Sequence, residues 1–221
     1  MAVEEIAILL RGVQLSGELS VPAKAPGLVV FAHGSGSSRH SPRNQYVAQS
    51  LNRGGLGTLL FDLLTAEEEE AEARTRHLRF DIPLLAERLA GATRWVLDQL
   101  DGSATPAGFF GSSTGAAAAL VAAVELGKPI QAVVSRGGRP DLAGDALDEV
   151  GAPTLLIVGG GDTPVIPLNE AAYARLRCEK SLRLVPGATH LFEEPGALEQ
   201  VAALAFEWFA GHLQPTTQAR R

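Results

Sequence analysis

The sequence G-S-S-T-G at residues 111–115 constrains this chain more than any other stretch. It follows a short apolar run, residues 107–110, that is typical of a buried strand, and it precedes the alanine-rich residues 116–123, which are typical of a buried helix. A strand that enters a helix through G-x-S-x-G has the pattern of a nucleophile elbow, in which glycines permit the tight turn. The pattern predicts that Ser113, rather than Ser112, is held above the end of the strand.

Strand-like and helix-like segments alternate along the rest of the chain, after an initial hairpin at residues 4–21 that turns at Arg11-Gly12. This alternation predicts an α/β fold, a mostly parallel sheet with an N-terminal antiparallel hairpin and helices on both faces. No repeat or linker interrupts it, so we expect one domain over residues 1–221 whose last residues, about 214–221, form a loose tail. Further strands are predicted at residues 28–32, 56–64, 107–110, 130–135, 154–158 and 181–185, and helices near 42–53, 82–96, 116–123, 169–176 and 198–209.

Two local signals concern the segment between the first and second of these helices. The acidic residues 67–72 predict a solvent-exposed helix start or loop. Asp81 is placed to cap a helix that tolerates Pro83 in its first turn.

Composition excludes several classes of protein. The formal net charge of −6 disfavours a nucleic-acid surface, and no apolar run approaches the roughly 18–20 residues that cross a bilayer. A single cysteine, Cys178, rules out an internal disulfide framework and suggests a reducing compartment. We therefore expect a soluble, cytoplasmic protein that binds neither nucleic acid nor membrane. No cluster of His, Cys, Asp and Glu has metal-ligand spacing, so no metal is expected.

Polar residues follow several of the predicted strands, at the edge where sites form in open α/β sheets. Ser113, Asp162 and His190 each occupy such a loop, separated by 49 and 28 residues. A serine hydroxyl needs a neighbouring base to take its proton, and a carboxylate behind a histidine orients that base. The order Ser, Asp, His is that of α/β-hydrolases. The three residues are therefore predicted to form a catalytic triad.

Alternatives exist for each member of this triad. Asp162 could simply cap the following helix, and Asp141, Asp145 and Asp148, which follow the preceding strand, could supply the acid instead. Ser113 and His190 could be ordinary loop residues. A further histidine, His33, is expected to brace a loop rather than to react.

Other residues at this edge could bind the substrate. Backbone amides can stabilise the oxyanion of acyl transfer, and the amides of Thr114 and Ser35 are the predicted donors. Arg39 and Arg136 are candidates for binding an acidic group of the substrate, against the alternative that they are solvated or ion-paired surface residues.

Four segments together, residues 31–36, 111–115, 161–165 and 187–190, resemble the α/β-hydrolase superfamily and, within it, small dienelactone-hydrolase-like proteins. This resemblance implies a nucleophile–acid–base triad and no cofactor. Dienelactone hydrolases carry cysteine as the nucleophile, so Ser113 favours general ester hydrolysis. About 18 residues separate Ser135 from Pro153, too few for the lid domain of many relatives, so we expect an open, shallow pocket.

These features predict a serine hydrolase that cleaves small-molecule carboxylic esters of small to medium acyl groups through an acyl-enzyme. A thioesterase or a hydrolase of lactones or amides would use the same triad. A non-catalytic binding protein with this fold is the second class of function, although such proteins commonly lack a triad member.

Overall fold

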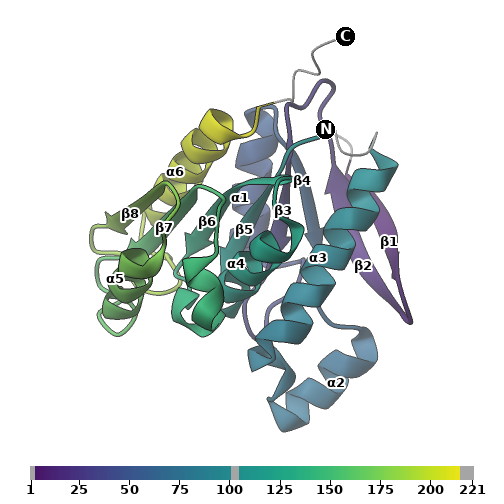
Figure 1. The fold of residues 1–221 in the computed structure, drawn as a ribbon, viewed down its shortest axis with the longest axis horizontal. Coiled ribbons are helices and arrows are strands. Elements are labelled where there is room, and N and C mark those ends of the chain that lie inside the picture. The colour runs from purple at the N-terminus through teal and green to yellow at the C-terminus, as the bar shows by residue number, and fades with distance from the viewer. Residues whose placement is uncertain (1–2, 101–104, 215–221) are drawn as a thin grey trace.

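A computed structural model describes residues 3–100 and 105–214 of the chain, so the predicted C-terminal tail lies almost wholly outside the described residues. Its centre is an eight-stranded sheet with the order β1-β2-β4-β3-β5-β6-β7-β8 (Figure 1). β2 pairs antiparallel with both β1 and β4, and the other neighbouring strands are parallel, which confirms the predicted mostly parallel sheet and its hairpin. The strands are β1 Glu4–Leu10, β2 Val13–Ser20, β3 Leu28–Ala32, β4 Gly57–Phe61, β5 Ala107–Ser112, β6 Ile130–Arg136, β7 Thr154–Gly159 and β8 Lys180–Val185.

Helices cover both faces of this sheet, as predicted. α1 Pro42–Arg53 and α6 Ala197–His212 pack on one face, whereas α3 Ile82–Gln99, α4 Thr114–Leu126 and α5 Ile166–Arg175 pack on the other (Figure 1). α2 Ala66–Thr75 and the short 3-10 helices η1 Leu78–Phe80 and η3 Pro140–Asp148 complete the described elements. None of the described helices is both long and apolar enough to span a membrane.

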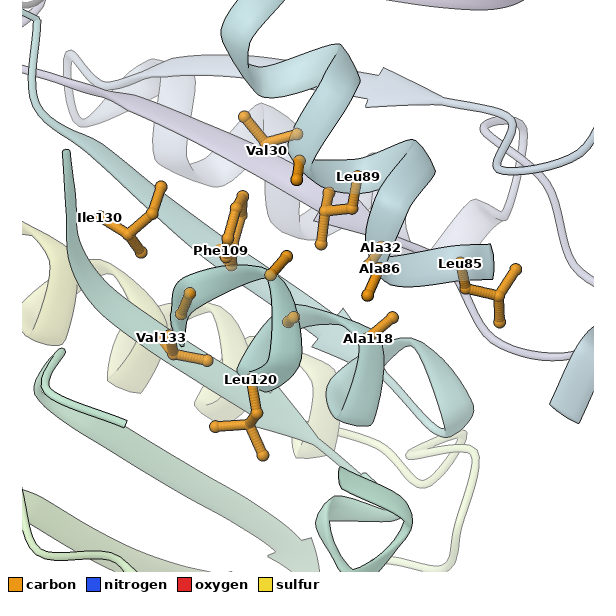
Figure 2. Close-up of a cluster of buried hydrophobic side chains, with 14 of the residues drawn as sticks. Val30, Ala32, Leu85, Ala86, Leu89, Phe109, Ala118, Leu120, Ile130 and Val133 are labelled. Atoms are coloured by element: carbon orange, nitrogen blue, oxygen red, sulfur yellow. The ribbon is translucent and has the colours of Figure 1, made fainter. Parts of the chain in front are cut away.

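The central strands are buried on both faces because their side chains alternate between two apolar clusters. Val30 and Phe109 contribute to the cluster under α3 and α4, and their neighbours Phe31 and Phe110 to the cluster under α1 and α6. Figure 2 shows the first cluster, with Leu89 and other side chains of the covering helices packed against the strands. Full burial of each such side chain contributes about 1.5–3 kcal/mol, so this core fixes the position of the strand ends.

The helix boundaries follow their capping residues. The Asp81 carboxylate accepts from the Leu84 amide at 3.1 Å, and Pro83 lies in the first turn of α3, which confirms the predicted cap. The acidic segment is helix α2, opened by Thr65 in a capping box. The prediction of a solvent-exposed segment is wrong for Glu72, which is 1% exposed because its carboxylate accepts from Arg79 and from a backbone amide.

Candidate active site

The strand-to-helix turn after β5 is tight, as the G-x-S-x-G pattern predicts, and its backbone is also strained. Ser113 lies between β5 and α4 with φ of 51° and ψ of −122°, a region that side chains rarely adopt. Such a conformation costs on the order of 1–3 kcal/mol and persists only where the surrounding structure imposes it.

Close packing around this turn explains the two flanking glycines. A Cβ atom on Gly115 would lie 2.2 Å from the carbonyl oxygen of Ala32, and one on Gly111 would lie 2.5 Å from the Cα atom of Ala116. Both distances are far inside van der Waals contact, so no larger residue fits. The turn is therefore wedged between β3 and its own helix, with Ser113 at the apex.

His190 and Asp162 meet at the same edge of the sheet. The Nδ1 atom of His190 lies 2.7 Å from Oδ2 of Asp162, whose side chain is 7% exposed, whereas that of His190 is 40% exposed. The loops that carry them are held together by the backbone, since the Gly161 amide donates to the Ala188 carbonyl at 2.8 Å. A Cβ atom on Gly159 would lie 2.4 Å from that same carbonyl oxygen, so the loops pack without intervening side chains.

The other candidate acids are occupied elsewhere. Asp141 forms two hydrogen bonds with Arg139, at 2.9 and 2.7 Å. Asp145 and Asp148 both accept from Arg175. Of the four aspartates that the sequence left open, Asp162 alone contacts His190.

Ser113 and His190 line one cleft of about 220 Å³. The remaining lining comes from the loop after β3, the start of α1, the ends of β5 and β6 and the loop after β8. These residues are Gly34, Ser35, Ser37, Ser41, Arg43, Asn44, Ser112, Arg136 and Leu191, and none of them is acidic. The structure therefore brings the predicted nucleophile and base to a single concave surface.

The two predicted oxyanion donors have different surroundings. Thr114 is the first residue of α4, where amides lack intrahelical partners, and its amide meets no acceptor among the described residues. The Ser35 amide donates to the Thr114 hydroxyl at 3.1 Å. The Ser35 donor is thus adjacent to the elbow but engaged by a side chain.

His33 braces the loop that carries Ser35, as expected. Its buried ring accepts from the Leu63 amide at Nε2, 3.0 Å away, so the hydrogen resides on Nδ1, which lies 3.0 Å from the Gly34 carbonyl oxygen. Burial lowers the pKa of His33, and a neutral ring is needed to accept the amide. His33 therefore ties the loop to the end of β4.

The two candidate arginines lie in different places. Arg39 pairs with Asp62 and approaches Glu18 at 3.8 Å, and it lines a neighbouring cleft rather than the one with Ser113. Arg136, at the end of β6, lines the Ser113 cleft and is 5% exposed. The alternative of a solvated surface arginine is therefore wrong for Arg136.

One contributor to the cleft was not anticipated. Asn44 is buried in the first turn of α1, where its Oδ1 accepts from Ser112 at 3.0 Å and from Arg136 at 3.1 Å. The Ser41-Pro42 helix start is the signal that could have placed it, because that turn follows a loop at the carboxyl edge of the sheet. No group of three His, Cys, Asp or Glu side chains among the described residues is arranged to hold a metal ion.

This sheet and its covering helices form the α/β-hydrolase fold. A crystal structure of a dienelactone hydrolase from Anabaena variabilis is 58% identical in sequence, with a TM-score of 0.94, and the match covers 96% of this chain and 99% of that one. The chain therefore belongs to the dienelactone hydrolase family. An α/β serine hydrolase homologue from Coxiella burnetii, 18% identical with a TM-score of 0.76 over 94% of this chain and 97% of that one, shares the fold.

Two longer proteins are also similar to this chain. They come from two strains of Mycobacterium tuberculosis, are provisionally named as phosphoribosyl transferases, and are 58% identical over 210 residues. The match covers 95% of this chain but 46% of theirs, so the chain spans about half the length of these curated relatives. No protein-family model matches the chain.

Proposed function

We propose that this protein is a serine hydrolase that cleaves carboxylic esters of small to medium acyl groups through Ser113, His190 and Asp162. The observation that carries the proposal is the 2.7 Å hydrogen bond from His190 to Asp162 beside a cleft that His190 shares with the strained Ser113. A plain loop serine has no need of a strained backbone, and a plain loop histidine has no need of a buried carboxylate partner.

The proposed chemistry follows from which ring nitrogen of His190 is already hydrogen-bonded. Because Asp162 accepts from Nδ1, the Nε2 atom of His190 is the one that can take the Ser113 proton. The Ser113 oxygen attacks the ester carbonyl, His190 returns the proton to the departing alcohol, and an acyl-enzyme remains. Water then attacks the acyl carbonyl while His190 takes its proton, the bond to the Ser113 oxygen breaks, and His190 returns the proton to Ser113 as the carboxylic acid leaves. The Asp162 carboxylate stabilises the imidazolium that forms on His190.

The oxyanion would form at the start of α4. The Thr114 amide is an available donor there. The Ser35 amide becomes a second donor when it gives up its hydrogen bond to the Thr114 hydroxyl and donates to the substrate oxyanion instead. Thr114→Val removes that competing acceptor while it keeps both amides. We expect kcat/KM to be maintained or to rise. A loss of 100-fold or more would show that the hydroxyl itself is needed and that the Ser35 amide is not the donor.

A fluorophosphonate probe tests the proposal directly, since it reacts with an activated serine and retains the phosphonyl group. We expect labelling of the native protein, mapped by mass spectrometry to Ser113 rather than Ser112, and no labelling of a folded Ser113→Ala variant. Absence of labelling in folded native protein would refute the hydrolase proposal and favour a binding protein.

Other acyl substrates use the same machinery. Thioesters and lactones present the same carbonyl carbon to Ser113, so a matched set of an ester, a thioester and a lactone of one acyl group would rank them. We further propose that the transferase activity named for the longer relatives belongs to the half that this chain does not cover, since this chain, which matches the other half, also matches 99% of the length of a dienelactone hydrolase.

A further inference from the structure

Arg136 is a buried cation without an anionic partner. Its side chain is 5% exposed, and no carboxylate of the described residues lies within ion-pair distance. Its Nη2 atom donates to neutral oxygens, Oδ1 of Asn44 at 3.1 Å and Oγ of Ser112 at 3.0 Å, while its Nε atom is buried without an acceptor. The guanidinium carbon also lies 5.8 Å from the ring centre of Phe192. These contacts orient the guanidinium but leave its charge uncompensated.

A second cation faces the same cleft. Arg43, in the first turn of α1, lines the cleft, and its own Nε atom is buried without an acceptor. Its carboxylate partner, Glu193 at 3.2 Å, is 65% exposed, and surface pairs of this kind are weak. Burial, together with repulsion from Arg43, lowers the pKa of Arg136 to about 10. The two arginines thus line one cleft, where Arg43 has the exposed Glu193 as a partner and Arg136 has no carboxylate partner among the described residues.

Uncompensated buried charge is a large penalty to the folded state, and a purely structural brace at this position would not need it. The cleft that both arginines line also holds Ser113 and His190, and none of its lining residues is acidic. A ligand anion in this cleft would compensate Arg136 and would give Arg43 a second partner besides the exposed Glu193. Guanidinium groups are the preferred partners of oxyanions, because their planar donors match the geometry of carboxylate and phosphate.

We propose that Arg136 and Arg43 bind a phosphate monoester group carried by the ester substrate of Ser113. The proposal rests on the hydrolase function proposed above and names its substrate class. Two neighbouring cations match the double negative charge of a phosphate monoester better than the single charge of a carboxylate. The phosphate is the recognised group and stays intact, while the carboxylic ester is the bond that breaks.

Three aryl esters of equal length, ending in phosphate, carboxylate or a neutral methyl group, test this specificity. We expect kcat/KM to be highest for the phosphate ester, at least about tenfold above the neutral one. Equal values for the phosphate and neutral esters would overturn the proposal. A preference for the carboxylate over the phosphate would overturn the assignment to a doubly charged group.

Arg136→Met is the informative variant, because Ser112 and Asn44 remain bonded to each other at 3.0 Å without the arginine. We expect the ratio of phosphate to neutral kcat/KM to fall about 10- to 100-fold, with a melting temperature no lower than that of the native protein. Equal losses on both esters, with a lower melting temperature, would show a structural brace instead. Arg139→Gln is the matched control, since Arg139 follows the same strand but pairs with Asp141 outside the cleft.

Binding of inorganic phosphate, measured by calorimetry with the native protein, separates this proposal from the hydrolase proposal. Phosphate that binds native protein but not Arg136→Met supports the subsite even if no ester is hydrolysed. Hydrolysis of all three esters without phosphate binding and without an anion preference would remove the subsite and leave the hydrolase function intact.

Discussion

Substitution of Asp162 by asparagine tests the contact on which the proposed chemistry depends. The variant is isosteric, so the loops that join β7 and β8 to the site should keep their packing. When the centres of the imidazolium and carboxylate charges are about 4 Å apart, their attraction is on the order of 4 kcal/mol at an effective dielectric constant near 20. Solvent weakens this attraction because the His190 side chain is 40% exposed. An asparagine amide that donates to Nδ1 adds a second loss, because it holds His190 in the wrong tautomer. A total of about 4 kcal/mol corresponds to a loss of about 10³-fold in kcat.

Initial rates on a neutral p-nitrophenyl ester, with fluorophosphonate labelling as a second readout, measure this loss. Asp148→Asn is the matched control, because Asp148 follows the neighbouring strand and pairs with Arg175 rather than with His190. We expect the control to keep nearly full activity. An Asp162→Asn variant with more than about a tenth of native kcat, or a control that loses as much as Asp162→Asn, would refute the triad assignment.

Three further substitutions probe the surroundings of the site. Gly115→Ala should abolish ester hydrolysis and lower the melting temperature, because its Cβ atom would meet the Ala32 carbonyl oxygen at 2.2 Å; a native-like melting temperature would contradict the wedged turn. Ser113→Gly should unfold at a higher urea concentration than Ser113→Ala, because glycine relieves the strain at a φ of 51°; the reverse order would show that the turn stores no strain. Burial lowers the pKa of His33, so the unfolded state takes up a proton first as the pH falls below about 6.5, and stability should decline by up to about 1.4 kcal/mol per pH unit. Urea unfolding of His33→Asn at pH 7.5 and 5.5 should show a smaller decline, and an equal decline would assign the acid sensitivity to other groups.

The sequence predicted the fold well because most of its apolar segments match the pattern of a single type of secondary structure. Residues 28–32 and 154–158 are continuous runs, which suit strands covered on both faces, and both are strands. The exposure of Glu72 was mispredicted since its partner, Arg79, lies seven residues away across a helix end. A run of charged residues indicates solvent exposure only when no oppositely charged side chain from another segment packs against it.

For the site, too, some features could be predicted from the sequence and others could not. Chain order and strand ends were enough to select Ser113 and His190, but four aspartates remained as candidate acids, because a choice among them depends on which loops touch. The contact between the loop at residues 159–161 and the Ala188 carbonyl brings Asp162, rather than the other three, to His190, and that contact is not visible in the sequence. Likewise, burial of Arg136 depends on Asn44, 92 residues earlier in the chain.

Energetic costs gather at one edge of this sheet. Three charged side chains are buried among the described residues. Glu72 has a cationic partner and Asp162 bonds to His190, whereas Arg136 has no anionic partner in the described part of the chain. The strained Ser113 lies in the same cleft as Arg136. Packing of the core requires neither feature, because the apolar clusters on both faces of the sheet are continuous without them. We therefore propose that the strain at Ser113 and the uncompensated charge of Arg136 both serve a ligand of this cleft, the strain by presenting the Ser113 hydroxyl and the charge by selecting anionic substrates.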